Sequence, residues 1–123
     1  DLGELENEIS EIDFLHSVKN KVETGGIRHS DLLNKKVKKV AVLGGSGSFA
    51  IAAAKAQNAD VLVTSDLKYH DFYQAENSIL LADVGHFESE RYVKNYIFDY
   101  LSKKIRTFAI ILSSIKTNPV NYL

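Results

Sequence analysis

Four nearly continuous apolar runs recur along the chain, with helical segments between them. The runs cover residues 38–43, 60–64, 79–83 and 107–112. Strands that are apolar on both faces are typical of a parallel sheet buried between two layers of helices. The order of the elements therefore predicts the α/β class, with a largely parallel or mixed sheet and helices on both faces.

The remaining segments are assigned from their periodicity and their end signals. Ser10 and Asp13 form a capping-box pattern, which predicts a helix over residues 10–22. A weak strand is expected at 27–30, and residues 1–9, acidic and aperiodic, are expected to be a frayed leading segment. Further helices are predicted at 49–58, 69–77 and 89–104. The last of these should turn an inner face to the core, with Tyr92, Tyr96, Ile97, Tyr100 and Leu101.

Length and composition fit one globular domain. The chain has 123 residues and a net charge of −1, which gives no electrostatic reason to expect nucleic acid or an anionic membrane as a partner. It contains no cysteine, so disulfides and thiolate metal ligands are excluded, and a cytoplasmic location is the default expectation. Its longest apolar run is too short to span a bilayer. The chain starts with aspartate and contains no methionine, which indicates a fragment of a larger protein.

A glycine-rich segment, "LGGSGSF", follows the first buried run. Gly44, Gly45, Ser46 and Gly47 lie between a predicted strand and a predicted helix, where free amides and the helix dipole favour anions. The segment has neither the lysine of a Walker loop nor the glycine spacing of a dinucleotide fingerprint. The alternative interpretation is a tight turn in which the glycines let strand and helix approach closely.

A second polar segment, "TSDLKYHD", follows the next run. It places Asp66 and His70 beyond the carboxyl end of a strand, the edge at which open α/β sheets bind ligands. Both are candidate catalytic residues. Asp66 could equally cap a helix, and His70 could be an ordinary surface residue.

The third polar segment, "GHFESE", follows the run at 79–83. A helix that begins near Glu88 would bring His86 and Glu90, four residues apart, to one place. Imidazole and carboxylate together suit zinc, iron or manganese. The alternative is a hydrogen-bonded or capping pair, and the other histidines show no partnered spacing.

Taken together, four motifs resemble one known family. "VAVLGGSGSF", "ADVLVTSDLKYHD", "DVGHFESE" and "SSIKTNPVNYL" occur in the order, and with roughly the spacing, of the NIF three-like (YbgI-like) proteins, some of which are called GTP cyclohydrolase 1 type 2 homologs. The resemblance covers about residues 3–123. It implies that this chain is the carboxy-terminal half of a protein with two similar α/β halves.

The resemblance also implies a site and an assembly. By this resemblance, the full-length protein is expected to hold a dinuclear metal centre between its two halves and to assemble into a toroidal homohexamer. The family's metal-ligand positions in this half match His86 and Glu90 of this chain. Glu88 is not a ligand by this match. Asp66 and His70 match positions near the cleft, although Ser65 stands where glycine is commoner. Two divalent ions (Zn, Fe or Mn) are expected in the full-length protein. The fragment alone is expected to bind metal weakly or not at all.

Two functions follow as hypotheses. One is a metal-dependent hydrolase of a nucleotide-like or phosphorylated small molecule, with the glycine-rich segment holding an anion and His70 as acid or base. The other is a non-enzymatic metal-binding or regulatory scaffold. Fold-level analogy does not identify a substrate, so the sequence leaves both open.

Overall fold

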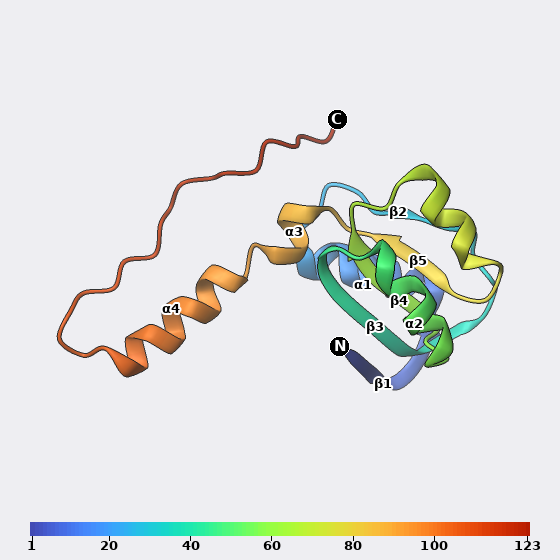
Figure 1. The fold of residues 1–123 in the computed structure, drawn as a ribbon, viewed down its shortest axis with the longest axis horizontal. Coiled ribbons are helices and arrows are strands. Elements are labelled where there is room, and N and C mark those ends of the chain that lie inside the picture. Colours follow the sequence, from blue (N-terminus) through green and yellow to red (C-terminus); the bar gives the residue numbers. More distant parts are fainter.

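Figure 1 shows a five-stranded sheet with helices packed against it and a long arm that leaves the sheet after the last strand. The structure is a computed structural model that describes residues 1–123. The strand order is β1-β3-β4-β5-β2. The central strands β3, β4 and β5 are parallel, and β1 and β2 pair antiparallel at the two edges. The bounds are β1 (Leu2–Ser10), β2 (Arg28–His29), β3 (Lys36–Ser46), β4 (Val61–Ser65) and β5 (Leu80–Asp83).

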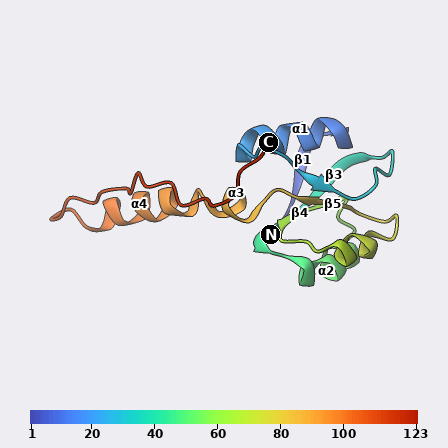
Figure 2. The ribbon, with the colours of Figure 1, turned by 90° about the horizontal axis from the view of Figure 1, so that it is seen from above.

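Helices cover both faces of the sheet. Figure 2 shows α1 on one face and α2 on the other, with α4 pointing away from both. None of the helices combines the length and the apolar character needed to cross a membrane. The α-helices are α1 (Glu11–Val22), α2 (Ile51–Ala56), α3 (His86–Glu90) and α4 (Val93–Lys104), and 3₁₀ helices occur at Ser48–Ala50 and Tyr69–Ala75.

The apolar core is divided between the two faces of the sheet. Along β4, Val61 and Val63 pack with α1, whereas Leu62 between them packs with α2. Successive side chains of a strand point to opposite faces, so a central strand covered on both sides must be apolar at every position. This confirms the predicted α/β class with helices on both faces, and the sheet is mixed because both edge strands are antiparallel.

The predicted first helix is confirmed together with its cap. Ser10 Oγ accepts a hydrogen bond from the Asp13 amide (3.1 Å) and donates one to the Asp13 carboxylate (2.6 Å). The helix ends at Val22, and its C-cap residue, Glu23, takes the left-handed conformation (φ 53°).

The prediction of a frayed segment at residues 1–9 is wrong. These residues form β1, whose Leu2 and Gly3 lie opposite Ala41 and Val40 of β3. The pairing rests on backbone hydrogen bonds, which need no apolar periodicity, and an edge strand can carry acidic side chains on its solvent side. A periodicity argument therefore misses such a strand.

The predicted strand at 107–112 is also wrong, since these residues lie in an extended segment outside the sheet. The place beside β5 is filled by β2, where Arg28 lies opposite Asp83 and His29 opposite Ala82. The predicted helix at 89–104 is interrupted before α4, and its expected inner face does not reach the core: no residue of α4 is buried.

Candidate metal centre

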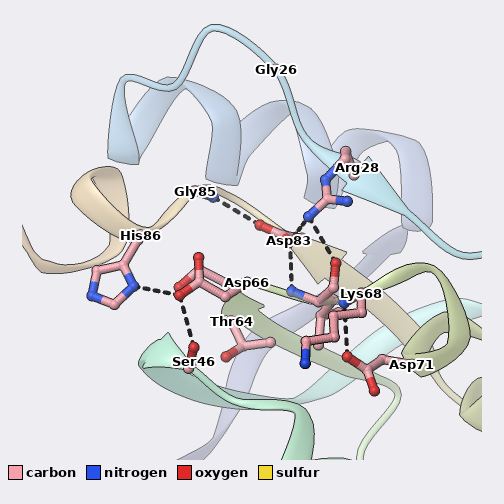
Figure 3. Close-up of polar contacts among 12 residues, drawn as sticks. Gly26, Arg28, Ser46, Thr64, Asp66, Lys68, Asp71, Asp83, Gly85 and His86 are labelled. Atoms are coloured by element: carbon pink, nitrogen blue, oxygen red, sulfur yellow. Dashed lines mark hydrogen bonds and ion pairs between the residues drawn. The ribbon is translucent and has the colours of Figure 1, made fainter. Parts of the chain in front are cut away.

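The polar residues singled out in the sequence converge at the carboxyl ends of the central strands. Ser46 ends β3, Asp66 follows β4, and His86 begins α3 shortly after β5 (Figure 3). Because the three strands are parallel, their carboxyl ends lie at one edge of the sheet. Residues about 20 positions apart in the sequence thus become neighbours in space.

His86 and Glu90 lie one helical turn apart on α3 and face each other. The distance from His86 Nε2 to the nearer carboxylate oxygen of Glu90 is 3.1 Å. Both side chains are about half exposed, 51% and 49%. Gly85, with φ 91°, turns the chain directly from β5 into α3, a conformation that side-chain-bearing residues avoid. The short turn projects the pair from the edge of the sheet.

The other nitrogen of the His86 ring is held by Asp66. His86 Nδ1 lies 2.6 Å from Asp66 Oδ2, which also accepts a hydrogen bond from Ser46 Oγ (2.7 Å) (Figure 3). The hydrogen bond to His86 is the main reason that the pKa of Asp66 is lowered, so this carboxylate is ionised and only accepts. The same bond raises the pKa of His86. Nδ1 therefore carries the proton, and Nε2 is directed at Glu90.

The turn that carries Asp66 is stabilised by hydrogen bonds to Asp83 and Arg28. Asp66 has a left-handed backbone (φ 57°), and the next amide, that of Leu67, donates to the buried carboxylate of Asp83 (3.0 Å). Arg28 pairs with Asp83 and also donates to the Leu67 carbonyl (2.9 Å) (Figure 3). Asp83 accepts from the Gly85 amide as well (3.0 Å), so one carboxylate fixes both turns of the site.

The His86–Glu90 pair fits two ligand positions on one divalent ion. Ligand atoms about 2.1 Å from an ion and 90–109° apart lie roughly 3.0–3.4 Å from each other, and the observed separation is 3.1 Å. Asp66 contacts the opposite nitrogen of the ring, as the outer-shell partner of a metal-binding histidine does. It cannot bind the same ion, and no three His, Asp or Glu side chains converge as a ligand set. The chain thus offers two ligands of a centre.

Gly45 leaves space for the Glu90 carboxylate. A β-carbon at this position would lie 2.6 Å from Glu90 Oε1 and 3.6 Å from His86 Cε1. The Gly45 amide donates to Ser89 Oγ (2.9 Å), which links the glycine-rich segment to α3. Residue 45 therefore has to be glycine for Glu90 to keep its place.

The glycine-rich segment makes close packing contacts. The Gly45 amide is bound by Ser89, and the Gly47 amide donates to the Ser65 carbonyl (3.3 Å). Gly47 also lies against Thr64, where a β-carbon would collide with the side chain. These contacts correspond to the tight-turn interpretation, and anion binding by Gly44, Gly45, Ser46 and Gly47 stays a prediction.

His70 and Glu88 lie apart from the pair. The His70 ring stacks edge-on against Tyr69, with 5.2 Å between centroids, and no hydrogen bond or ion pair joins it to Asp66 or His86. Glu88 is buried and accepts from the Asn118 side chain (3.1 Å). The catalytic role of His70 therefore stays a prediction.

Three supporting residues were not found from the sequence. Ser46 had been considered only as part of the glycine-rich segment. Arg28 lies far in the sequence from the three polar segments that form the site. Asp83 carried one usable signal, because it is a carboxylate at the end of an otherwise apolar run. A charge in such a place is rarely buried unless it is paired, as here with Arg28.

Comparison with known proteins places this chain in a family. The model of the family described as Duf34/NIF3 (NGG1p interacting factor 3) matches residues 1–119. Proteins named GTP cyclohydrolase 1 type 2 homolog are similar over 99% of this chain, with 32% identity in Staphylococcus aureus (strain MSSA476) and 35% in Bacillus subtilis (strain 168). This chain covers 34% of the length of each.

A solved structure shows the same fold. The Bacillus cereus protein related to NIF3 superposes with a TM-score of 0.83 and 32% identity, over 99% of this chain and 35% of that chain. The chain thus spans about a third of the relatives that it matches. Since the family model matches nearly every residue, the chain belongs to the DUF34/NIF3 family.

Proposed function

We propose that this chain supplies two ligands, His86 and Glu90, to a divalent metal centre that acts in hydrolysis of a nucleotide-like or phosphorylated small molecule. The observation that carries the proposal is the 3.1 Å approach of His86 Nε2 to the Glu90 carboxylate, with the other nitrogen of the ring held by Asp66.

The residues of the chain have distinct roles in this proposal. Asp66 keeps the proton on His86 Nδ1 and so presents the Nε2 lone pair to the ion. Glu90 adds negative charge beside it, and Gly45 leaves the space that Glu90 occupies. A divalent ion held there would supply Lewis acidity toward a phosphoryl or carbonyl oxygen. The name of the S. aureus and B. subtilis relatives suggests nucleotides as the substrate class.

Two ligands leave most of a coordination sphere open, and the chain offers no third His, Asp or Glu to the same place. We propose that the remaining ligands come from a second α/β half of a full-length protein, and that the full centre holds two ions of Zn, Fe or Mn. A toroidal homohexamer and a cytoplasmic location are further predictions from the family resemblance.

A non-enzymatic metal-binding or regulatory scaffold is the alternative. One observation favours it: the candidate acid or base, His70, does not contact the His86–Glu90 pair. The two functions differ in turnover, so activity against a panel of nucleotides and phosphate esters separates them.

Paramagnetic broadening by Mn²⁺ tests the ligand assignment on this chain, because it detects weak binding that metal analysis after desalting would miss. We expect selective broadening of His86 and Glu90 resonances, lost in His86→Ala and Glu90→Ala and retained in the control His16→Ala. His16 lies on α1. Broadening that persists in His86→Ala would refute the assignment.

A further inference from the structure

The last eleven residues, "SSIKTNPVNYL" at 113–123, form the tail of the carboxy-terminal arm, which comprises residues 93–123. The arm leaves the sheet with α4 and returns as an extended segment whose end lies near α1 and α3 (Figures 1 and 2). The tail forms neither helix nor strand, and Asn118 is its one residue that is not exposed. A segment with so little structure of its own is placed by specific contacts with the core.

Asn118 makes the polar contact between the tail and α3. Its Nδ2 donates to Glu88 Oε1 (3.1 Å), and its Oδ1 accepts from the Val120 amide (3.1 Å). The second bond closes an Asx turn, which folds the chain at Pro119 and directs the amide nitrogen at Glu88. The side chain of Asn118 is thus held at both of its polar atoms.

Glu88 is the one buried residue of α3. Its 5% exposure is unusual, because a glutamate is rarely buried unless it is paired. It forms no ion pair, and its side chain accepts one hydrogen bond, from Asn118. The short helix that carries the two candidate ligands therefore has its buried residue bound by the tail.

Tyr122 makes the second contact of the tail. Its ring lies on Gly25, where a β-carbon would be 2.3 Å from Tyr122 Cγ, and its hydroxyl accepts from Thr24 Oγ1 (3.4 Å). The hydroxyl also lies beside Gly85: a β-carbon there would be 3.0 Å from it and 2.4 Å from Glu88 Oε2. The tail thus reaches the turn before α3 as well as the helix.

The tail and the candidate ligands lie on opposite sides of α3. Glu88 is two positions from His86 and two from Glu90, and residues two apart on a helix do not face each other. The helix has five residues and no side-chain cap, and on its other side the Gly45 amide donates to Ser89 Oγ (2.9 Å). A single-turn helix moves as a unit, so a displacement of Glu88 displaces both ligands.

We propose that docking of the tail on α3 positions the His86–Glu90 pair, with Glu88 and Asn118 as positioning residues. Docking holds the His86 ring against Asp66 and, through the same orientation of α3, strengthens metal binding at the pair. Coupling between two sites is reciprocal, so a metal ion at the pair strengthens docking by the same factor. The effect on metal binding rests on the proposed function, whereas the effect on the His86 ring does not.

A role of Glu88 as a third ligand fits less well. Its carboxylate lies beside Gly85 and Asn118, and no three His, Asp or Glu side chains converge as a ligand set. The two roles differ in one respect that can be measured. A ligand is lost only when Glu88 itself is changed, whereas a positioning contact is also lost when the tail is released elsewhere.

Gly25→Ala releases the tail without a change in α3 or in the tail itself. The added β-carbon collides with the Tyr122 ring, whereas in the control Gly26→Ala it lies 3.9 Å from that ring, an ordinary contact. NMR of the 123-residue chain reports docking by nuclear Overhauser contacts between the Tyr122 ring and Thr24. The ring-nitrogen shifts of neutral His86 report its tautomer, and unchanged amide shifts in β4 show that each variant is folded.

We expect Gly25→Ala to lose the Tyr122 contacts and to give His86 a mixture of tautomers in place of the single Nδ1–H form. We expect the Mn²⁺ titration followed at Glu90 to shift at least about fivefold toward weaker binding, the low end of typical coupling between sites. Gly26→Ala should change neither. Saturating Mn²⁺ should restore part of the docking in Gly25→Ala, as reciprocity requires.

Asn118→Asp tests the polar contact directly. It keeps the acceptor for the Val120 amide and replaces the donor to Glu88 by a second carboxylate, so we expect the same losses. The control Asn121→Asp adds the same charge at an exposed residue of the tail and should leave docking and the His86 tautomer unchanged. The double substitution Glu88→Gln with Asn118→Asp exchanges amide and carboxylate and should restore both.

A released tail with an unchanged His86 tautomer would overturn the proposal. Tyr122 contacts that persist in both Gly25→Ala and Asn118→Asp would also overturn it, since the named contacts would then not hold the tail. Failure of the double substitution to restore docking would exclude the Glu88–Asn118 bond as the cause. Absence of Mn²⁺ broadening at His86 and Glu90 in the wild-type chain contradicts the proposed function alone, and the tautomer then decides the role of the tail.

Discussion

Asp66 and His86 lie 20 residues apart in the sequence, and their side chains meet with 2.6 Å between Oδ2 and Nδ1. Asp66 directly follows β4, and His86 begins α3 shortly after the adjacent parallel strand β5. The contact gives a surface histidine one fixed tautomer and one direction. The candidate metal centre depends on this contact as much as on the ligands themselves.

Replacing Asp66 by asparagine should weaken metal binding without unfolding the chain. An amide can still accept from His86 Nδ1, but it carries no charge to raise the basicity of the ring. Loss of such an outer-shell partner typically costs about 10- to 100-fold in affinity. We expect the Mn²⁺ titration to shift by that factor, and not to shift in the control Asp71→Asn, a carboxylate whose partners are the Lys68 amide and the Gln74 side chain. Equal affinity in Asp66→Asn would contradict the role.

The Asp66–His86 pair should give the metal-free protein a defined pH dependence. The pKa of Asp66 is lowered by its bond to His86, so its contribution to stability is present above its unfolded pKa and is lost as the pH falls through the folded one. The pKa of His86 is raised by the same bond, so its contribution is present below its unfolded pKa and is lost as the pH rises through the folded one.

The stability difference between wild type and Asp66→Asn should therefore be largest between about pH 4 and 6.5. It should be small, because both side chains are about half exposed and water screens the pair. Urea unfolding across this range measures it, and NMR titration of the His86 ring reports the raised pKa directly. A His86 pKa that Asp66→Asn leaves unchanged would count against the pairing.

Gly45→Ala should displace Glu90. The added β-carbon would lie 2.6 Å from Glu90 Oε1, and the backbone has φ 71°, which alanine adopts only with strain of about 1 kcal/mol. We expect a modest loss in unfolding free energy and loss of Mn²⁺ broadening at Glu90. Gly3→Ala is the matched control, because a β-carbon there meets nothing within 4 Å. Retained broadening at Glu90 in Gly45→Ala would show that the carboxylate does not need this space.

Arg28→Ala should destabilise the chain and loosen the turn at Asp66. It removes the ion-pair partner of the buried Asp83 and the donor to the Leu67 carbonyl. We expect a loss of about 1–3 kcal/mol, since Arg28 is itself largely exposed and water can partly replace it. Urea unfolding gives the loss, and faster exchange of the Leu67 amide would locate it. Arg106→Ala, an exposed arginine of the arm, is the control and should change neither.

The sequence by itself determined the central strands and the two candidate ligands. The runs that became β3, β4 and β5 are apolar at successive positions, which only a doubly covered strand requires. His86 and Glu90 are four residues apart, so a helix of any environment brings them together. These are local consequences of spacing and side-chain type.

The tertiary structure alone decided the edges of the sheet and the support of the site. β1 is held by backbone hydrogen bonds, and the pattern of its side chains does not predict this pairing. β2 takes the place beside β5 that the segment at 107–112 was expected to take. Arg28, Asp83 and Asp66 meet only because β2, β4 and β5 are brought together by the sheet. A strand-like sequence indicates that a segment can pair with another strand. Its partner is decided by which strand edges the rest of the folded chain leaves free.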